Sequence, residues 1–162
     1  MKYAHRFSVE APLADVAQFH QRSASMAVIT PPPIVVRIHE APAVLGEGDE
    51  MAFTLWLGPL PMRWRARIEQ TGPSGFADRL IKGPFASWVH QHVFVETGSD
   101  ATEVIDMVSA KLSDRPFWRL AGLALWAGMP LLFTYRAWKT RRLLQRPSVA
   151  GSSPARTQGA KR

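Results

Sequence analysis

Cysteine is absent from this chain of 162 residues. Its absence excludes disulfide bonds, thiolate nucleophiles and zinc sites built on cysteine, and it is typical of a protein in a reducing cytoplasm. The sequence also has no Gly-x-Ser-x-Gly nucleophile elbow, no P-loop and no Gly-x-Gly-x-x-Gly fingerprint. Residues 1–10 contain no continuous apolar segment, so we expect no secretory signal. These absences favour a cytoplasmic protein without a cofactor.

Acidic residues are missing from the C-terminal end of the chain. Residues 136–162 contain eight Lys or Arg and no Asp or Glu, whereas residues 1–135 hold 12 basic and 13 acidic residues, a formal charge of −1. The net charge of +7 therefore belongs to the end, and we expect no nucleic-acid binding by the nearly neutral body. The length suits one domain, which we place at residues 1–146, before a disordered basic tail at residues 147–162.

Short stretches of alternating apolar and polar residues, each ended by a turn-forming cluster, run through most of the chain. Their spacing is that of a hairpin meander, in which neighbouring strands are antiparallel. Apolar residues at helical spacing predict two short helices after the first strand, at residues 13–20 and 24–29. The strands are expected at residues 2–10, 34–44, 50–57, 62–70, 76–82, 87–96 and 102–112.

Residues 116–145 predict one long helix, with Ser113 or Asp114 as its N-cap and a kink near Pro130. Three of its apolar residues lie on one side: Trp126, Met129 and Phe133. Six others form a separate apolar stripe: Leu120, Leu123, Ala124, Ala127, Leu131 and Trp138.

Residues 120–135 of this helix carry no charge, and basic residues flank them on both sides. A spanning helix needs about 20 apolar residues, whereas this run has 16 and includes two glycines and a proline. We therefore expect a core helix covered by the sheet. In the alternative interpretation, the protein is peripheral at the inner face of the membrane. Four basic residues would then meet the anionic surface: Arg136, Lys139, Arg141 and Arg142.

Residues 83–94 form the most informative stretch, because a Gly-Pro turn is followed by strict alternation. Trp88, His90, His92 and Phe94 share one face of the predicted strand, and mostly aliphatic residues share the other. One face of this strand is therefore aromatic and titratable.

The turn at residues 98–100 sets the register of this strand against the next one. If the turn centres on residue 99, His92 lies opposite Asp106. A turn near residues 83–84 brings Asp78 opposite His90 or His92. The sequence thus predicts a patch of four residues across three strands, and these are the candidate catalytic residues: Asp78, His90, His92 and Asp106.

An Asp beside a His raises the imidazole pKa and fixes its tautomer, which prepares a general base. The same arrangement satisfies half-buried polar groups or orients a ligand, and we favour this role over catalysis. Two His and an Asp also match a metal-ligand set, but a His-x-His spacing alone is a weak signal. We therefore predict no metal site.

Aromatic residues are numerous for a domain of this size. One curved sheet against one helix does not close-pack this many aromatic side chains without leaving an internal cavity. A largely apolar pocket with a few polar groups is the usual small-ligand site. We expect eight residues to line it: Trp88, His90, His92, Phe94, Asp106, Trp118, Trp126 and Met129.

The order of strand, two short helices, six-strand meander and long C-terminal helix resembles the START-like or SRPBCC superfamily, over about residues 1–145. Several short segments also resemble a bacterial cyclase/dehydrase-like branch: Trp64 and Ile68, residues 76–78, 83–85, 88–94, 102–106 and 133–136. The resemblance implies an α+β helix-grip fold, in which a curved antiparallel sheet wraps the last helix around a cavity. It implies binding of hydrophobic small molecules or lipids, with enzymes in the minority.

Three functions follow as hypotheses. The first is non-catalytic binding or carriage of a hydrophobic small molecule or lipid in the cavity between sheet and helix. The second is a polyketide cyclase/dehydratase-like enzyme that uses a His–Asp pair, with His90 or His92 as the base. The third is a peripheral membrane module that acts through the apolar helix and the basic tail, and its binding would be salt-sensitive. The first and third are compatible with each other.

Overall fold

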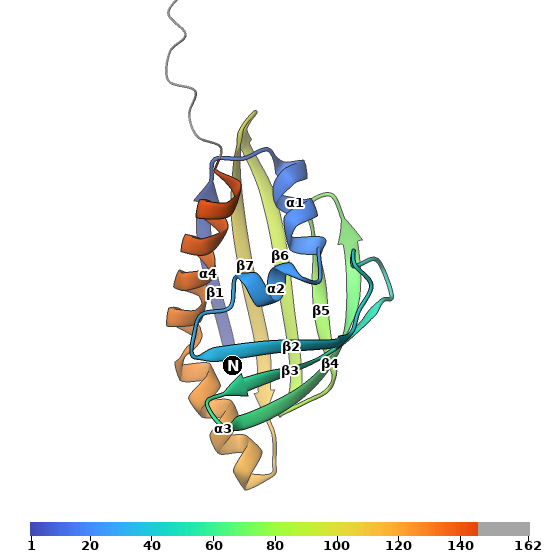
Figure 1. Cartoon of the computed structure of the whole chain (residues 1–162), viewed down its shortest axis with the longest axis vertical. Helices are drawn as coiled ribbons and strands as arrows, with labels where there is room; N and C mark the ends of the chain where they lie inside the picture. The colour runs from blue at the N-terminus through green and yellow to red at the C-terminus, as the bar shows by residue number, and fades with distance from the viewer. Residues whose placement is uncertain (146–162) are drawn as a thin grey trace, which may run out of the picture.

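The computed structural model describes residues 1–145, so the predicted tail at residues 147–162 lies outside the described part. These residues form four helices and one antiparallel sheet, which has seven strands (Figure 1). The strands are β1 (Lys2–Val9), β2 (Ile34–Glu40), β3 (Glu50–Leu57), β4 (Leu60–Gly72), β5 (Gly75–Lys82), β6 (Phe85–Gly98) and β7 (Ala101–Leu112). The helices are α1 (Leu13–Gln21), α2 (Ser25–Val28), α3 (Pro116–Ala127) and α4 (Met129–Leu144).

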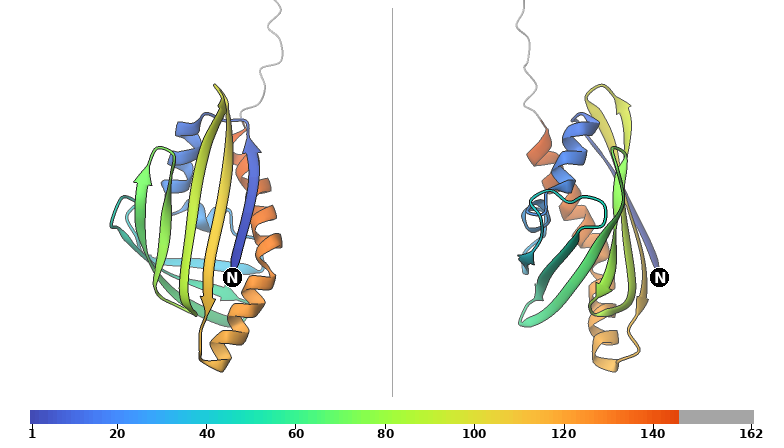
Figure 2. Two further views of the ribbon diagram at one scale, coloured as in Figure 1. Left: turned by 180° about the vertical axis from the view of Figure 1, so that it is seen from behind. Right: turned by 90° about the vertical axis from the view of Figure 1, so that its right-hand side faces the viewer.

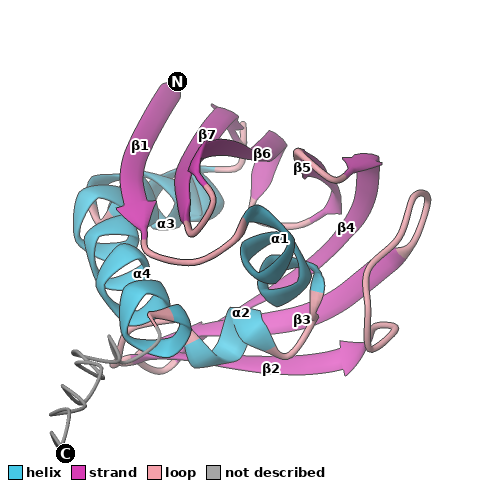
Figure 3. Ribbon diagram, turned by 90° about the horizontal axis from the view of Figure 1, so that it is seen from above, coloured by secondary structure: helices cyan, strands magenta, loops and turns pink. Residues whose placement is uncertain are grey.

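The strands are ordered β1-β7-β6-β5-β4-β3-β2. The sheet is strongly curved, and the helices lie on its concave side (Figure 2). Seen from above, α4 lies beside β1 at the open side of the curve, between the two edge strands, while α1 and α2 lie across the inside (Figure 3). This is the α+β helix-grip architecture that the sequence predicts, with the antiparallel meander and both short helices confirmed.

The predicted second strand is too long at its C-terminal end, because β2 ends at Glu40 and not at residue 44. The backbone that follows bonds elsewhere: the Ala43 carbonyl accepts a hydrogen bond from Ser23 N, and Leu45 N donates to the Gln21 carbonyl. The chain after β2 therefore leaves the sheet to pair with the segment behind α1.

The predicted C-terminal helix is two helices, because the chain bends by 48° between α3 and α4. The break lies at Gly128, two residues before the expected site. Pro130 lies in the first turn of α4, where backbone N–H groups have no intrahelical partner, so the missing N–H of proline costs no hydrogen bond. The predicted cap is wrong as well. Arg115 is the N-cap of α3 without a side-chain capping bond, and its own N–H donates to Ser113 Oγ over 3.3 Å.

The predicted apolar stripe of the C-terminal helices faces outward. Leu120 is 70% exposed and Leu131 75% exposed, whereas Met129 and Phe133 are buried. The reason is visible at Gly122, where an added Cβ would stand 3.0 Å from the Leu112 side chain. A small residue at this position lets α3 approach the sheet closely, and Leu120 and Leu123 stay on the exposed side of the helix.

Within residues 1–145, neither of these helices alone has the length and apolar character to cross a bilayer. The bent pair of α3 and α4 together meets the requirements for a membrane-spanning segment, by length and composition only.

Candidate functional site

Three neighbouring strands bring the predicted polar patch together. Asp78 of β5 lies directly opposite His90 of β6, and His92 lies opposite Asp106 of β7. Both pairings are those predicted from the turns, because the connections between these strands are too short to allow a slip without turning every side chain to the other face. The four-residue patch is confirmed as a contiguous cluster.

His90 is held between two carboxylates. Its Nδ1 lies 3.2 Å from Asp78 Oδ2, and its Nε2 lies 3.1 Å from Asp106 Oδ1. Burial lowers the pKa of His90, but hydrogen bonds to Asp106 and Asp78 and their charges outweigh it and raise the pKa to about 9. With a carboxylate at each ring nitrogen, His90 is an imidazolium at neutral pH.

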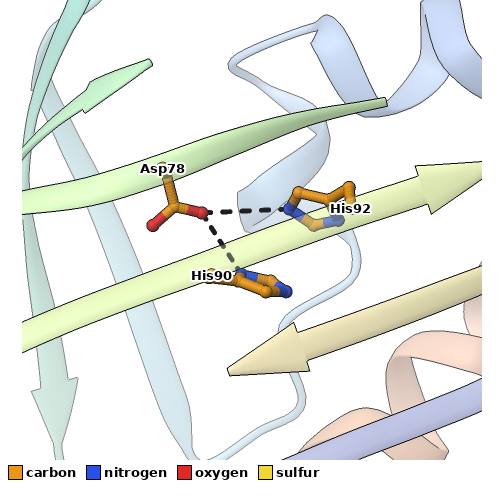
Figure 4. A group of neighbouring side chains, drawn as sticks. All are labelled: Asp78, His90 and His92. Carbon is orange, nitrogen blue, oxygen red and sulfur yellow. Dashed lines mark ion pairs between the residues drawn. The ribbon is translucent and has the colours of Figure 1, made fainter. Parts of the chain in front are cut away.

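His92 shares Asp106 with His90 but stays neutral. Its Nδ1 lies 2.8 Å from Asp106 Oδ1, and its Nε2 is 3.9 Å from Asp78 Oδ2. Burial and the positive charge of His90 lower the pKa of His92. Burial raises the pKa of Asp106, yet its contacts with both histidines hold that pKa well below the usual range. Figure 4 shows the Asp78 carboxylate directed at both imidazoles.

His20 belongs to the same site, although in the sequence it stands apart from the other candidate residues. It comes from α1, its ring centroid lies 5.7 Å from that of His92, and its Nδ1 is 2.8 Å from the Val16 carbonyl oxygen. Burial, followed by the repulsion of His92, lowers the pKa of His20 to about 4. The sequence could have indicated this position, because His20 continues the apolar stripe of the helix at i+4 from Val16 and therefore faces the interior.

Arg136 is the second residue whose place differs from the one that the sequence suggests. Its charge groups it with the basic residues of a membrane-facing surface, but its side chain lines the interior cavity and lies over the Phe133 ring, 5.4 Å from the centroid. Helical spacing explains this position, since Arg136 follows the buried Phe133 by three residues and Met129 by seven.

The cavity lies between the sheet and the helices, and its volume is about 120 Å³. Apolar side chains of β3, β4, β5, β6 and α4 make up most of its wall, among them Phe53, Trp64, Ala66, Phe76, Trp88 and Met129. Its polar wall includes Arg22 and Ser23 near α1 together with the cluster and its two newly recognised neighbours: His20, Asp78, His90, His92 and Arg136.

Of the eight residues predicted to line a cavity, four do so in the structure: Trp88, His90, His92 and Met129. The other four do not line it. Asp106 supports the two histidines, and Phe94 packs against His20 at 5.1 Å. Trp126 packs edge-on against Trp88, while Trp118 packs against Phe117. Whether any of the eight contacts a ligand stays a prediction.

Three side chains of the cluster also have the geometry of a cation site. One ligand atom from each of Asp78, His90 and His92 lies within 4.8 Å of the others. However, the positive charges of His90 and Arg136 already offset the buried Asp106 and the half-buried Asp78. A metal ion would have to displace a proton that both Asp78 and Asp106 hold on His90. The prediction of no metal site therefore stands as a prediction.

No protein-family model matches the sequence, and no curated protein matches it. Solved structures match over most of the chain. An aromatase/cyclase, Zhui, from a Streptomyces species has a TM-score of 0.71 at 15% identity, covering 89% of this chain and 93% of its own. A Thermus thermophilus protein has a TM-score of 0.66 at 14% identity, covering 90% and 100%. Norcoclaurine synthase from Thalictrum flavum has a TM-score of 0.62 at 15% identity, covering 88% and 85%. The fold is thus the SRPBCC-like helix-grip fold.

Proposed function

We propose that this chain binds and carries a hydrophobic small molecule in the cavity between the sheet and helices α3 and α4. The cavity is the observation that carries the proposal. Its wall is mostly apolar and aromatic, and several of its polar groups belong to one connected cluster around His90. Pockets of this composition commonly bind small apolar ligands, with the few polar groups fixing their orientation.

The volume of the cavity limits the size of the ligand that it can hold. A volume of about 120 Å³ is close to that of the engineered apolar cavity of roughly 150 Å³ that takes up benzene. A ligand of about one aromatic ring therefore fits, and a long-chain or two-chain lipid does not. Norcoclaurine synthase, which shares this fold, is solved with dopamine and hydroxybenzaldehyde, and each of those molecules contains a single ring.

Catalysis by a His–Asp pair is the competing function. His90 is a poor general base, because both of its nitrogens face carboxylates. His92 is neutral, and within residues 1–145 its Nε2 has no hydrogen bond and no ion pair closer than the 3.9 Å to Asp78. If the chain is an enzyme of the cyclase or dehydratase kind, His92 is therefore its base.

Titration with toluene, followed by NMR, tests the carrier. We expect saturable shifts confined to cavity-lining residues, and loss of binding in Ala66→Leu, which fills the cavity. Ala52→Leu adds the same atoms to the neighbouring strand outside this cavity and is the control. Absence of saturable binding in the unmodified protein, or unchanged binding in Ala66→Leu, contradicts the proposal. Conversion of a ring-containing ligand that His92→Gln abolishes would replace carriage with catalysis.

We further propose that the carrier docks on an anionic membrane through the outer face of α3 and α4, defined by Phe117, Leu120, Leu123, Leu131 and Trp138. All five side chains are exposed, from 44% at Leu123 to 75% at Leu131. Five large exposed apolar side chains on two consecutive helices are unusual in a protein that contacts only water.

The charges around this outer face favour a lipid surface over a second copy of the chain. Residues 115–145 contain basic residues and no Asp or Glu. Lys139 and Arg142 both lie over the Trp138 ring, at 6.0 and 5.2 Å from its centroid. Two such positive faces would repel each other, whereas anionic headgroups attract them while the apolar side chains enter the acyl boundary.

Two of the four basic residues predicted to contact the membrane instead contact the protein itself. Arg136 lines the cavity. Arg141 is engaged on the protein itself, since its Nε donates to the Ser8 carbonyl over 2.9 Å. Lys139 and Arg142 remain as the predicted residues that border the outer face.

Co-sedimentation of the full chain with phosphatidylglycerol–phosphatidylcholine vesicles tests the docking. We expect binding that weakens with salt and is lost in Leu120→Asp plus Leu131→Asp. Val35→Asp is the control, because Val35 is also exposed, at 58%, but lies on β2. Equal binding by the double variant contradicts the proposal. So does a dimer that the double variant abolishes, because the outer face would then be an interface between copies.

A further inference from the structure

Arg136 is a cation with one buried, unsatisfied donor in the wall of the cavity. Its Nε is buried and has no hydrogen-bond partner, and within residues 1–145 the guanidinium makes no ion pair. Its guanidinium lies over the Phe133 ring, 5.4 Å from the centroid, and that ring offers no acceptor lone pair. A buried charged donor without a partner costs more free energy than almost any other unsatisfied group.

The neighbouring carboxylates do not meet this need. Asp106 lies against His90 and His92, and Asp78 lies against His90, so their near oxygens are already in use. They act on Arg136 only at a distance: burial lowers its pKa, and the charges of Asp106 and Asp78 partly restore it. A guanidinium still remains charged in proteins. A ligand that enters the cavity can supply the acceptor that Nε lacks.

We propose that the ligand of this cavity is an aromatic acid, whose carboxylate binds Arg136 while its ring occupies the apolar part. This inference rests on the proposed carrier function and adds the ligand's chemical class. A planar fork of N–H donors matches a carboxylate, and such charge-assisted pairs are about twice as strong as neutral hydrogen bonds.

The surroundings of Arg136 select for this class in two ways. The volume of about 120 Å³ limits the apolar body to about one ring. The His90 imidazolium offsets the charge of Asp78, the carboxylate that also lines the cavity, which reduces its repulsion of an incoming anion. A neutral analogue fills the same space but leaves the guanidinium unpaired, and a site built on a polar partner discriminates strongly against a ligand that lacks it.

The test compares phenylacetate with 2-phenylethanol, which share a ring and a two-carbon chain. We expect phenylacetate to bind at least about tenfold more tightly, which corresponds to one charge-assisted pair. In Arg136→Gln this preference disappears. Lys139→Gln removes the same charge from the same helix on its outer face and keeps the preference. The Arg136 Nε–H resonance shifts on addition of phenylacetate and not of 2-phenylethanol.

The outcomes separate this inference from the carrier function. Equal binding of both probes to the unmodified protein overturns the acid subsite and leaves the carrier intact. Binding of neither probe overturns both. A preference for phenylacetate that survives in Arg136→Gln assigns the carboxylate to another group and rejects the role of Arg136. Arg136→Lys keeps the charge without the fork, so it retains part of the preference.

Discussion

Nε2 of His90 lies 3.1 Å from Oδ1 of Asp106, although the two residues are not opposite each other in the sheet. His90 is paired with Val108, so the contact runs diagonally between β6 and β7. The same Asp106 oxygen lies 2.8 Å from Nδ1 of His92, its direct cross-strand partner. One buried carboxylate therefore contacts both imidazoles of the cavity wall, and it makes its hydrogen bond to His90.

The charge of His90 makes stability depend on pH above neutrality. Asp78 from β5, Asp106 from β7 and His92 from its own strand face this imidazole. Because its pKa rises from 6.5 to about 9 on folding, its stabilising contribution is complete below pH 6.5 and is lost as the pH rises through 9. The loss is on the order of a few kcal/mol, at about 1.4 kcal/mol per pKa unit. Urea unfolding at pH 6.5 and 9.5 should show this decline, and His90→Gln should lack it. A decline of equal size in His90→Gln would show that other groups cause it.

His20 makes stability depend on pH on the acid side. It faces His92, with Asp106 and Arg136 acting on it from further away. Folding lowers its pKa from 6.5 to about 4, so between these two pH values the unfolded chain binds a proton on His20 and the folded protein does not. Stability is therefore complete above pH 6.5 and falls as the pH drops toward 4. Thermal melts between pH 7 and 4.5 should show this fall in the unmodified protein and a flatter profile in His20→Gln. Parallel profiles for the two proteins would refute the assignment.

Gly75 is predicted to be irreplaceable at the start of β5. It has φ +141°, and a Cβ there would overlap the carbonyl oxygen of His92. Gly75→Ala should lower the free energy of unfolding by about 2 kcal/mol or more, since strain and a backbone collision act together. Gly72, its partner across the turn, has open space where a Cβ would stand, so Gly72→Ala should change stability little. Chemical denaturation of both variants checks the difference, and equal losses would contradict it.

Metal binding should be absent or weak at neutral pH. His90 holds a proton on each nitrogen between Asp78 and Asp106, and a metal ion must displace one of them. Elemental analysis after incubation with Zn²⁺ and dialysis should give well under one ion per chain. The double variant His90→Ala plus His92→Ala should give the same value. Stoichiometric metal that only the double variant loses would reassign the cluster as a metal centre.

Much of the sheet was predictable because its signals are local. Alternation marks each strand, and short turns leave little freedom in register, so the position of His92 opposite Asp106 follows from the turn before β7. The same logic fails at β2, whose end is set by hydrogen bonds to the distant Gln21 and Ser23. No pattern within the strand itself indicates those partners.

The inner and outer sides of the C-terminal helices were harder to predict. Size alone suggests that Leu120 and Leu131 are buried, yet close approach to the sheet demands small residues such as Gly122 on the inner side. Arg136 was misplaced for a related reason. Its charge suggests the surface, whereas its helical spacing from Phe133 places it in the cavity wall. Periodicity gave two apolar sides without deciding which faces the sheet, whereas for Arg136 it was a better guide than charge.

Native mass spectrometry of the untagged chain, followed by solvent extraction, tests the carrier function most directly. We expect an adduct of one small ring-containing molecule per chain, recovered unchanged in the extract and absent from Ala66→Leu. A long-chain lipid in the cavity at one per chain, or an adduct that Ala66→Leu keeps, would contradict a small-molecule carrier built on this cavity.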